Sequence, residues 1–167
     1  TGPEVSEDSL AQIEALQPGG VMIGGSMNHT DLLKITVQLR ALKTKIPLII
    51  AIDQEGGEVK RQSEDSLANP HVLGKVSDTE FCKTVGQSSR WLSELGININ
   101  FGIIADIAWT PESYIYNRSY GPDPVSVSRH VAEAIECTKG VMTTVKHFPG
   151  HGRSTQDSHE GIPIIPL

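Results

Sequence analysis

Short apolar runs alternate with longer amphipathic stretches along the chain, and this alternation restricts the possible folds more than any other feature. Residues 46–52 (IPLIIAI) are continuously apolar and rich in branched side chains, which is typical of a strand buried on both faces of a parallel sheet. Shorter runs predict further strands at residues 21–23, 97–107 and 140–145. The apolar spacing between these runs predicts helices over residues 8–17, 31–43, 78–95 and 124–139.

Strands that alternate with helices form a parallel sheet with right-handed crossovers, either doubly wound or closed into a barrel. The chain has 167 residues, whereas a complete (β/α)₈ barrel typically needs about 250 residues and rarely fewer than about 200. If the fold is a barrel, the chain covers only part of it. Residues 58–77 are polar and irregular, so we expect them to form a long surface loop.

Composition and charge indicate a folded protein and exclude several partners. The hydrophobic share is 38% and the charged share 20%, far from the values of disordered chains. With a net charge of −6 and no cluster of basic residues, the chain is not expected to bind nucleic acid. No apolar run is long enough to span a bilayer. The first residues lack the pattern of a signal peptide, although a signal removed earlier would leave no trace, so the compartment stays open, with the cytoplasm preferred.

The two cysteines, Cys82 and Cys137, lie far apart in the sequence and in unlike contexts. Their spacing matches neither a metal site nor a redox motif. We expect them to be buried free thiols rather than a disulfide, and they decide little about the compartment.

Polar side chains follow three of the predicted strands, at the point where each strand ends. They are the cluster at 53–55 (DQE), Asp106, and the pair Lys146 and His147. In parallel α/β folds the functional site lies at the carboxyl edge of the strands, and in barrels it draws residues from several of them. These side chains are therefore candidate site residues.

The strongest local signal is residues 146–152 (KHFPGHG), followed by residues 157–159 (DSH). The proline and two glycines predict a tightly turning loop that directs polar groups into a cleft. If Asp157 is hydrogen-bonded to one imidazole nitrogen of His159, it makes the other nitrogen a positioned proton donor and acceptor. On spacing alone, a turn cap is the more common explanation of this pair.

A zinc site is a further interpretation of this region, since His147, His151 and His159 could combine with Asp157. Their spacing is not that of a His-Glu-X-X-His helix, and Lys146 would repel a cation. We therefore expect no metal and no other cofactor.

Four motifs together resemble the β-N-acetylglucosaminidases of glycoside hydrolase family 3. They are KHFPGHG with the following DSH, IDQEGGEVKR at 52–61, NFGIIADI with AWTP at 100–111, and NRSYGPDP at 117–124. The resemblance runs from about residue 19 to the end. It implies a (β/α)₈ barrel, of which residues 1–167 form the N-terminal part with about five strands. It also implies retaining hydrolysis of terminal non-reducing β-N-acetylglucosamine from cell-wall muropeptides or chitin-type oligosaccharides.

The resemblance assigns roles to individual residues. Asp157 and His159 correspond to the acid/base pair of this subgroup, carried on a mobile loop. Asp106 takes a structural role in organising the loop, although its position at a strand end also suits a nucleophile. Substrate binding falls to Asp53, Arg118, Lys146 and His147, with an ion pair to Asp123 as the simpler explanation of Arg118.

A retaining glycosidase also needs a second carboxylate about 5 Å from the acid/base. In the family this nucleophile follows a later strand, in a segment like FSDD, and no such segment occurs here. We therefore expect this chain to be inactive alone and to pair with the rest of the barrel or with a second copy. The alternatives are a non-catalytic saccharide-binding fragment, an N-acetylglucosaminide phosphorylase or a β-glucosidase of the same family.

Overall fold

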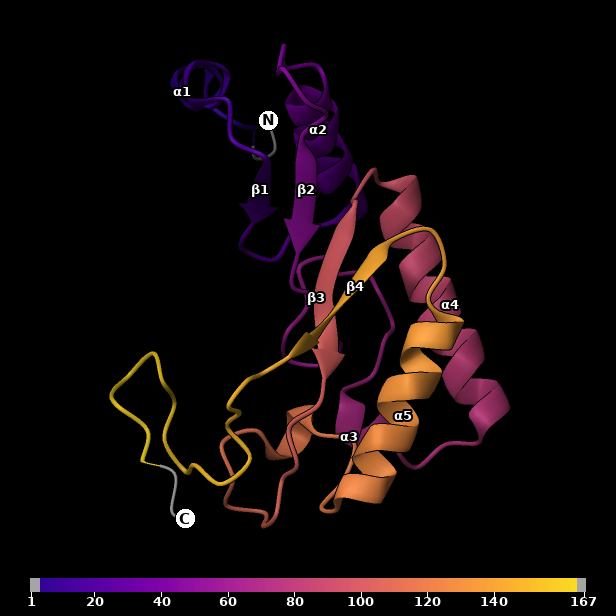
Figure 1. The fold of residues 1–167 in the computed structure, drawn as a ribbon. Helices are drawn as coiled ribbons and strands as arrows, with labels where there is room; N and C mark the ends of the chain where they lie inside the picture. The colour runs from indigo at the N-terminus through magenta and orange to yellow at the C-terminus, as the bar shows by residue number, and fades with distance from the viewer. Residues whose placement is uncertain (1–3, 165–167) are drawn as a thin grey trace.

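The computed structural model describes residues 4–164, and in them strands and helices alternate as the sequence predicts. Four parallel strands form one sheet in the order β1-β2-β3-β4, so β1 and β4 are its edges (Figure 1). The elements are α1 (Glu7–Leu16), β1 (Gly20–Ile23), α2 (His29–Arg40), β2 (Ile49–Ile52), α3 (Pro70–Leu73), α4 (Asp78–Glu94), β3 (Ile99–Ile104), the 3₁₀ turn η1 (Tyr116–Arg118), α5 (Pro124–Cys137) and β4 (Met142–Lys146).

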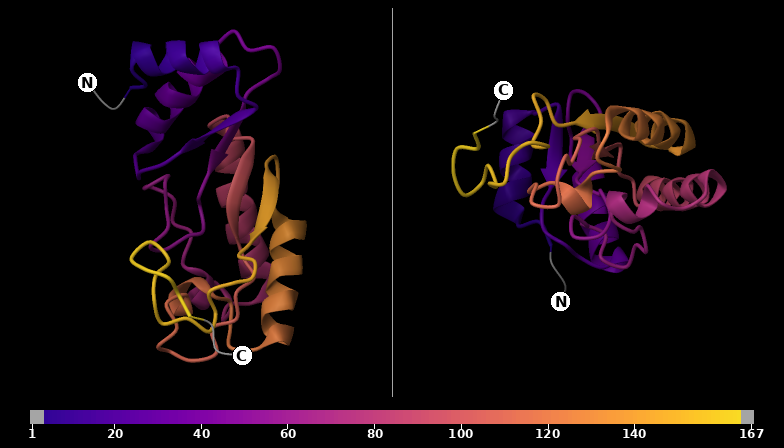
Figure 2. Two further views of the ribbon diagram at one scale, coloured as in Figure 1. Left: turned by 60° about the vertical axis from the view of Figure 1, so that its left-hand side comes forward. Right: turned by 90° about the horizontal axis from the view of Figure 1, so that it is seen from below.

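The carboxyl ends of the strands point toward one end of the molecule. There α3, η1 and the C-terminal segment gather, as Figures 1 and 2 show. The sheet is open and has four strands instead of the expected five or so, because residues 147–164 form turns rather than another strand. Strand side chains at its edges are about half exposed, among them Met22, Met142 and Val145.

Apolar faces of the helices pack on the sheet because their spacing places them on one side. In α2, the buried residues Leu32, Ile35, Thr36 and Leu39 follow the helical repeat. The α-helices α3, α4 and α5 each begin at a capping side chain; Asp123, for example, accepts hydrogen bonds from two backbone amides at the start of α5. None of the helices within residues 4–164 is long and apolar enough to cross a membrane.

The expectation that residues 58–77 form a surface loop is wrong. Gln62 and Asp65 are buried, and the segment includes the short helix α3. Asp65 accepts hydrogen bonds from the Gln54 side chain at 2.9 Å, the Leu67 amide at 3.0 Å and the Ser88 hydroxyl. Polar groups can be buried when they are paired in this way, and the partners come from segments that a local pattern cannot identify.

The expectation of free thiols is also wrong, because Cys82 of α4 and Cys137 of α5 form a disulfide. Their Cα atoms are 5.1 Å apart, although 55 positions separate them in sequence. In the chain α4 precedes β3 and α5 follows it, and in space the two helices pack side by side on one side of the sheet (Figure 1), which brings the two cysteines together.

We predict that this disulfide stabilises the helix pair by restricting the unfolded chain. Replacing both cysteines by serine should lower the free energy of unfolding by about 2–4 kcal/mol in denaturant titrations. Wild-type protein measured in a thiol reductant should lose the same amount, and the variant should not respond to the reductant. Equal stability of the oxidised wild type and the variant would contradict the prediction.

Candidate active site

A cavity of about 520 Å³ lies at the carboxyl ends of β2, β3 and β4. It takes its charged groups from three strand ends, because parallel strands deliver their following residues to the same edge. All four predicted substrate-binding residues and His159 line it. The lining residues are Asp53, Glu55, Val59, Arg61, Phe101, Tyr114, Arg118, Lys146, His147, His151, Ser158 and His159.

The buried carboxylate of Glu55 connects the charged groups of the cavity. Its residue is only 2% exposed. Arg118 donates to both of its oxygens, from Nε at 2.7 Å and from Nη2 at 2.9 Å, and Lys146 Nζ lies 2.6 Å from Oε1. Burial alone would lower the pKa of Arg118, but the hydrogen bonds and charge of Glu55 outweigh burial and raise that pKa. The arginine therefore stays charged inside the cavity.

Sequence reasoning placed Glu55 in the candidate cluster 53–55 but gave it no role of its own, and its simpler explanation of Arg118 by an ion pair with Asp123 is wrong. Asp123 caps α5, while Arg118 turns to Glu55. The position of Glu55, two residues after Asp53 in the loop after a buried strand, marked it as a candidate, but nothing in the sequence indicated that it pairs with Arg118 and Lys146.

Asp53 and Lys146 form a further ion pair of the cavity. The Lys146 Nζ lies 2.7 Å from Asp53 Oδ1, and Arg61 Nη2 lies 3.9 Å from the other oxygen, Oδ2. Both side chains are partly accessible. A carboxylate has more acceptor sites than these contacts use, and an ammonium group has three donors. The pair can therefore bind hydroxyl groups of a polar ligand.

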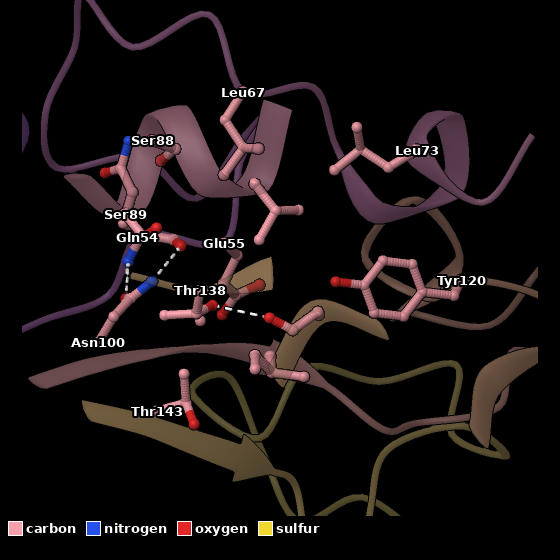
Figure 3. Close-up of a pocket in the computed structure, with 14 residues that line it drawn as sticks. Gln54, Glu55, Leu67, Leu73, Ser88, Ser89, Asn100, Tyr120, Thr138 and Thr143 are labelled. Carbon is pink, nitrogen blue, oxygen red and sulfur yellow. Dashed lines mark hydrogen bonds between the residues drawn. The ribbon is translucent and has the colours of Figure 1, made fainter. Parts of the chain in front are cut away.

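Asn100 of β3 fixes the loop after β2, which carries Asp53 and Glu55 (Figure 3). Its amide group accepts from the Gln54 backbone N–H and donates to the Gln54 carbonyl, both at 2.9 Å. A small cavity of about 30 Å³ lies beside this clamp, with the Tyr120 hydroxyl pointing into it. Burial, and secondarily the charge of Glu55, raises the pKa of Tyr120, so its hydroxyl remains protonated. Neither Asn100 nor Tyr120 was predicted as a site residue.

Asp106 fixes the loop that follows β4. This buried carboxylate accepts from the His147 backbone amide at 3.1 Å, from His147 Nδ1 and from the His151 amide. Burial raises the pKa of Asp106, but these hydrogen bonds outweigh it and the pKa falls below its ordinary value. With Nδ1 donating to a carboxylate, Nε2 of His147 is the ring nitrogen that can accept a hydrogen bond, and the residue lines the cavity. The contacts of Asp106 agree with the structural role expected for it.

Asp157 and His159 form the pair that the sequence predicts. Asp157 Oδ1 lies 2.9 Å from the His159 backbone N and 2.7 Å from its Nδ1. Hydrogen bonds from the His159 amide and ring, and from the Tyr114 hydroxyl, lower the pKa of Asp157 to about 2. An ionised carboxylate only accepts, so Nδ1 is the donor, and Nε2 has no hydrogen-bond partner among residues 4–164. The His159 side chain is 85% exposed and lines the cavity.

Comparison with known proteins agrees with the fold and the motifs. The sequence profile of the family described as "Glycosyl hydrolase family 3 N terminal domain" matches residues 3–167. The β-hexosaminidase LpqI of Mycobacterium tuberculosis is 30% identical over 177 residues, which cover 99% of this chain and 44% of that protein. The chain therefore spans less than half the length of this curated relative.

Two solved structures share the fold. A glycoside hydrolase family 3 β-N-acetylglucosaminidase from Paenibacillus sp. str. FPU-7 superposes with a TM-score of 0.85 and 32% identity, covering 98% of this chain and 33% of that one. NagZ from Neisseria gonorrhoeae, solved with N-trifluoroacetyl-D-glucosamine, superposes with a TM-score of 0.80 and 30% identity, covering 97% of this chain and 52% of that one. The four strands are thus the N-terminal part of a (β/α)₈ barrel.

We predict that Glu55 stabilises the protein through its two cations. Glu55→Gln keeps the size of the side chain but leaves the largely buried Arg118 without its counter-charge and Lys146 with Asp53 alone, and should lower the free energy of unfolding by about 3 kcal/mol or more. Asp78→Asn is the matched control, because it breaks the exposed Arg129–Asp78 pair and should cost about 1 kcal/mol or less. Equal losses in urea titrations would contradict this role.

We also predict a pH dependence from Asp106. Its pKa is lower in the folded than in the unfolded protein, so its contribution to stability is present above the ordinary value of 3.8 and is lost as the pH falls through the folded pKa. Asp106→Asn should cost about 1–3 kcal/mol at neutral pH. The gap between wild type and variant should then narrow in acid. A gap that is constant between neutral and strongly acidic solution, measured by denaturant unfolding, would refute the prediction.

Proposed function

The chain belongs to glycosyl hydrolase family 3, whose N-terminal domain matches nearly its whole length, and from this premise we propose that the protein is a β-N-acetylglucosaminidase. It hydrolyses terminal non-reducing β-N-acetylglucosamine residues with retention of configuration. The observation that carries the proposal is the hydrogen-bonded pair of Asp157 and His159 at a cavity lined by charged groups. The names of its relatives, β-hexosaminidase and β-N-acetylglucosaminidase, support the same class of substrate.

In this proposal His159 is the acid/base. Its imidazolium donates the Nε2 proton to the glycosidic oxygen as the bond to the sugar carbon breaks, and Asp157 keeps Nδ1 protonated throughout. The neutral ring then accepts a proton at Nε2 from the water that releases the sugar. This proton balance is supported by the free Nε2 and the bonded Nδ1 of the pair.

The remaining predicted residues bind the sugar. Asp53 accepts hydroxyl hydrogens, Lys146 and Arg118 donate to sugar oxygens, and the free Nε2 of His147 meets a ring hydroxyl. Their place on one cavity wall supports this assignment. Muropeptides and chitin-type oligosaccharides both present the terminal sugar that such a wall would hold.

We propose that the nucleophile comes from outside residues 4–164. Among these residues, the carboxylates that line the cavity, Asp53 and Glu55, are both ion-paired with Lys146. Asp106 lies beneath His147, to which it is bonded. None of the three is free to serve as the nucleophilic carboxylate, which lies about 5 Å from the acid/base in a retaining glycosidase. The 167 residues are then one partial barrel domain, with little or no turnover until the rest of the barrel, or a second copy, completes the site.

A phosphorylase is the second candidate, because an imidazole acid/base carries no negative charge to repel incoming phosphate. A β-glucosidase or a purely saccharide-binding domain has no use for the Asp157–His159 pair, whose geometry therefore favours the first proposal. Product analysis distinguishes the two enzymes, since hydrolysis gives the free sugar and phosphorolysis gives a sugar phosphate.

The decisive test is turnover of 4-nitrophenyl N-acetyl-β-D-glucosaminide by the whole protein, with and without phosphate. His159→Ala should lower kcat by about a hundredfold or more, the usual contribution of a general acid/base. His71→Ala, at the packed pair of His71 and Tyr116, is the control and should keep wild-type turnover. Unchanged activity in His159→Ala, or robust turnover by the 167-residue chain alone, would contradict the proposal.

A further inference from the structure

His151 lines the cavity, yet it has no part in the proposed reaction. Its ring meets the ring of His147 at an interplanar angle of 86°, with 4.9 Å between the centroids. It also meets the ring of Tyr114, at 63° and 6.0 Å. Edge-to-face arrangements at such distances are favourable contacts between aromatic rings. His151 is therefore packed against the residue that the proposed function assigns to a sugar hydroxyl.

The backbone of His151 is held by the same buried carboxylate that holds His147. Asp106 Oδ1 accepts from the His151 amide, while Oδ2 accepts from the His147 amide and from its Nδ1. The His151 carbonyl accepts from the Ser154 amide at 2.9 Å. The Ser154 carbonyl in turn accepts from the Tyr114 amide, also at 2.9 Å. The backbone beneath both imidazole rings is thus fixed to Asp106 and to the segment after β3.

The next residue, Gly152, packs tightly on that segment. A Cβ atom at this position would lie 2.0 Å from the Ile107 carbonyl oxygen, a distance that no side chain allows. The Gly152 carbonyl also accepts from the Ser113 hydroxyl at 3.0 Å. The loop therefore has little room to shift, and the His151 ring is held against His147 by its backbone.

Packing, rather than a hydrogen bond, holds the Nδ1 edge of the His151 ring. This nitrogen is buried and has no hydrogen-bond partner among residues 4–164. Burial, followed by the positive charge of His147, lowers the pKa of His151, although the charge of Asp106 opposes this change. The His151 ring is therefore neutral at neutral pH. A neutral ring can lie against His147 without electrostatic repulsion.

The hydrogen bond from Nδ1 to Asp106 fixes one atom of the His147 ring but leaves the ring able to tilt about that atom. The His147 side chain is 26% exposed, so burial does not fix the tilt by itself. We propose that His151 is a positioning residue for His147, whose ring fixes the tilt of the His147 ring and so the direction in which Nε2 meets the sugar hydroxyl. The inference rests on the proposed sugar-binding function of His147.

A double-mutant cycle tests whether His151 acts through His147. The whole protein is assayed with 4-nitrophenyl N-acetyl-β-D-glucosaminide. His151→Ala should lower kcat/KM about tenfold, the value of one hydrogen bond, and His147→Ala should lower it at least as much. Because the effect of His151 passes through His147, the double variant should be no worse than His147→Ala. Losses that multiply in the double variant would show that His151 acts independently and would overturn the proposal.

His151→Phe keeps an aromatic ring against His147 and should restore most of kcat/KM. It also serves if His151→Ala folds poorly. A loss in His151→Phe as large as that in His151→Ala would show that a ring nitrogen, not the packed ring, is required, and the proposal would be wrong. His71→Ala is the matched control, because His71 packs on the ring of Tyr116 with centroids 4.4 Å apart. It should keep wild-type kcat/KM.

Binding of free N-acetylglucosamine, measured by calorimetry on the whole protein, gives a second readout that needs no turnover. The dissociation constant should rise about tenfold in His147→Ala and in His151→Ala, and should stay near the wild-type value in His151→Phe. If His147→Ala binds the sugar as tightly as the wild type, the proposed function of His147 fails. If His147→Ala weakens binding while His151→Ala leaves it unchanged, only the role of His151 is wrong.

Discussion

The site depends on the burial of one carboxylate between two cations. Glu55 follows β2, Lys146 ends β4, and Arg118 lies in the 3₁₀ turn after β3, so this one set of ion pairs ties three strand ends together. A charge removed from water is costly unless it is paired and hydrogen-bonded. Together with the backbone pairing of the strands, these groups hold the loops after the three strands in a fixed relation. The same requirement fixes the cavity wall that Lys146 and Arg118 present.

Around this cluster the groups differ in how firmly they are held. His147 is fixed at its backbone and its ring by the buried Asp106, while the His159 side chain stays 85% exposed with only one ring nitrogen bonded. This difference agrees with the proposed roles, sugar binding for His147 and proton transfer for His159. A rigid wall favours sugar binding, because the conformational entropy of its side chains is lost on folding and not again when the sugar binds. A proton donor must instead reach an oxygen whose position changes during the reaction.

The features that sequence alone predicted are those set by local pattern or by topology. Apolar periodicity located the strands and helices, and the parallel order of the strands brought Asp53, Lys146 and His147 to one edge. Features that needed distant partners were missed. The Cys82–Cys137 disulfide and the burial of Asp65 join segments that a linear pattern treats as unrelated. Polarity in a sequence does not reveal whether a side chain meets water or another polar group.

The central claim is that charged groups from three strand ends bind a sugar beneath the His159 imidazole. A crystal structure of the whole protein with N-acetylglucosamine tests it most directly. The account predicts that sugar hydroxyls bond to Asp53, Lys146, His147 and Arg118, with His159 Nε2 facing the anomeric oxygen and Asp157 on its other nitrogen. A sugar bound elsewhere, or a His159 ring directed away from that oxygen, would contradict it.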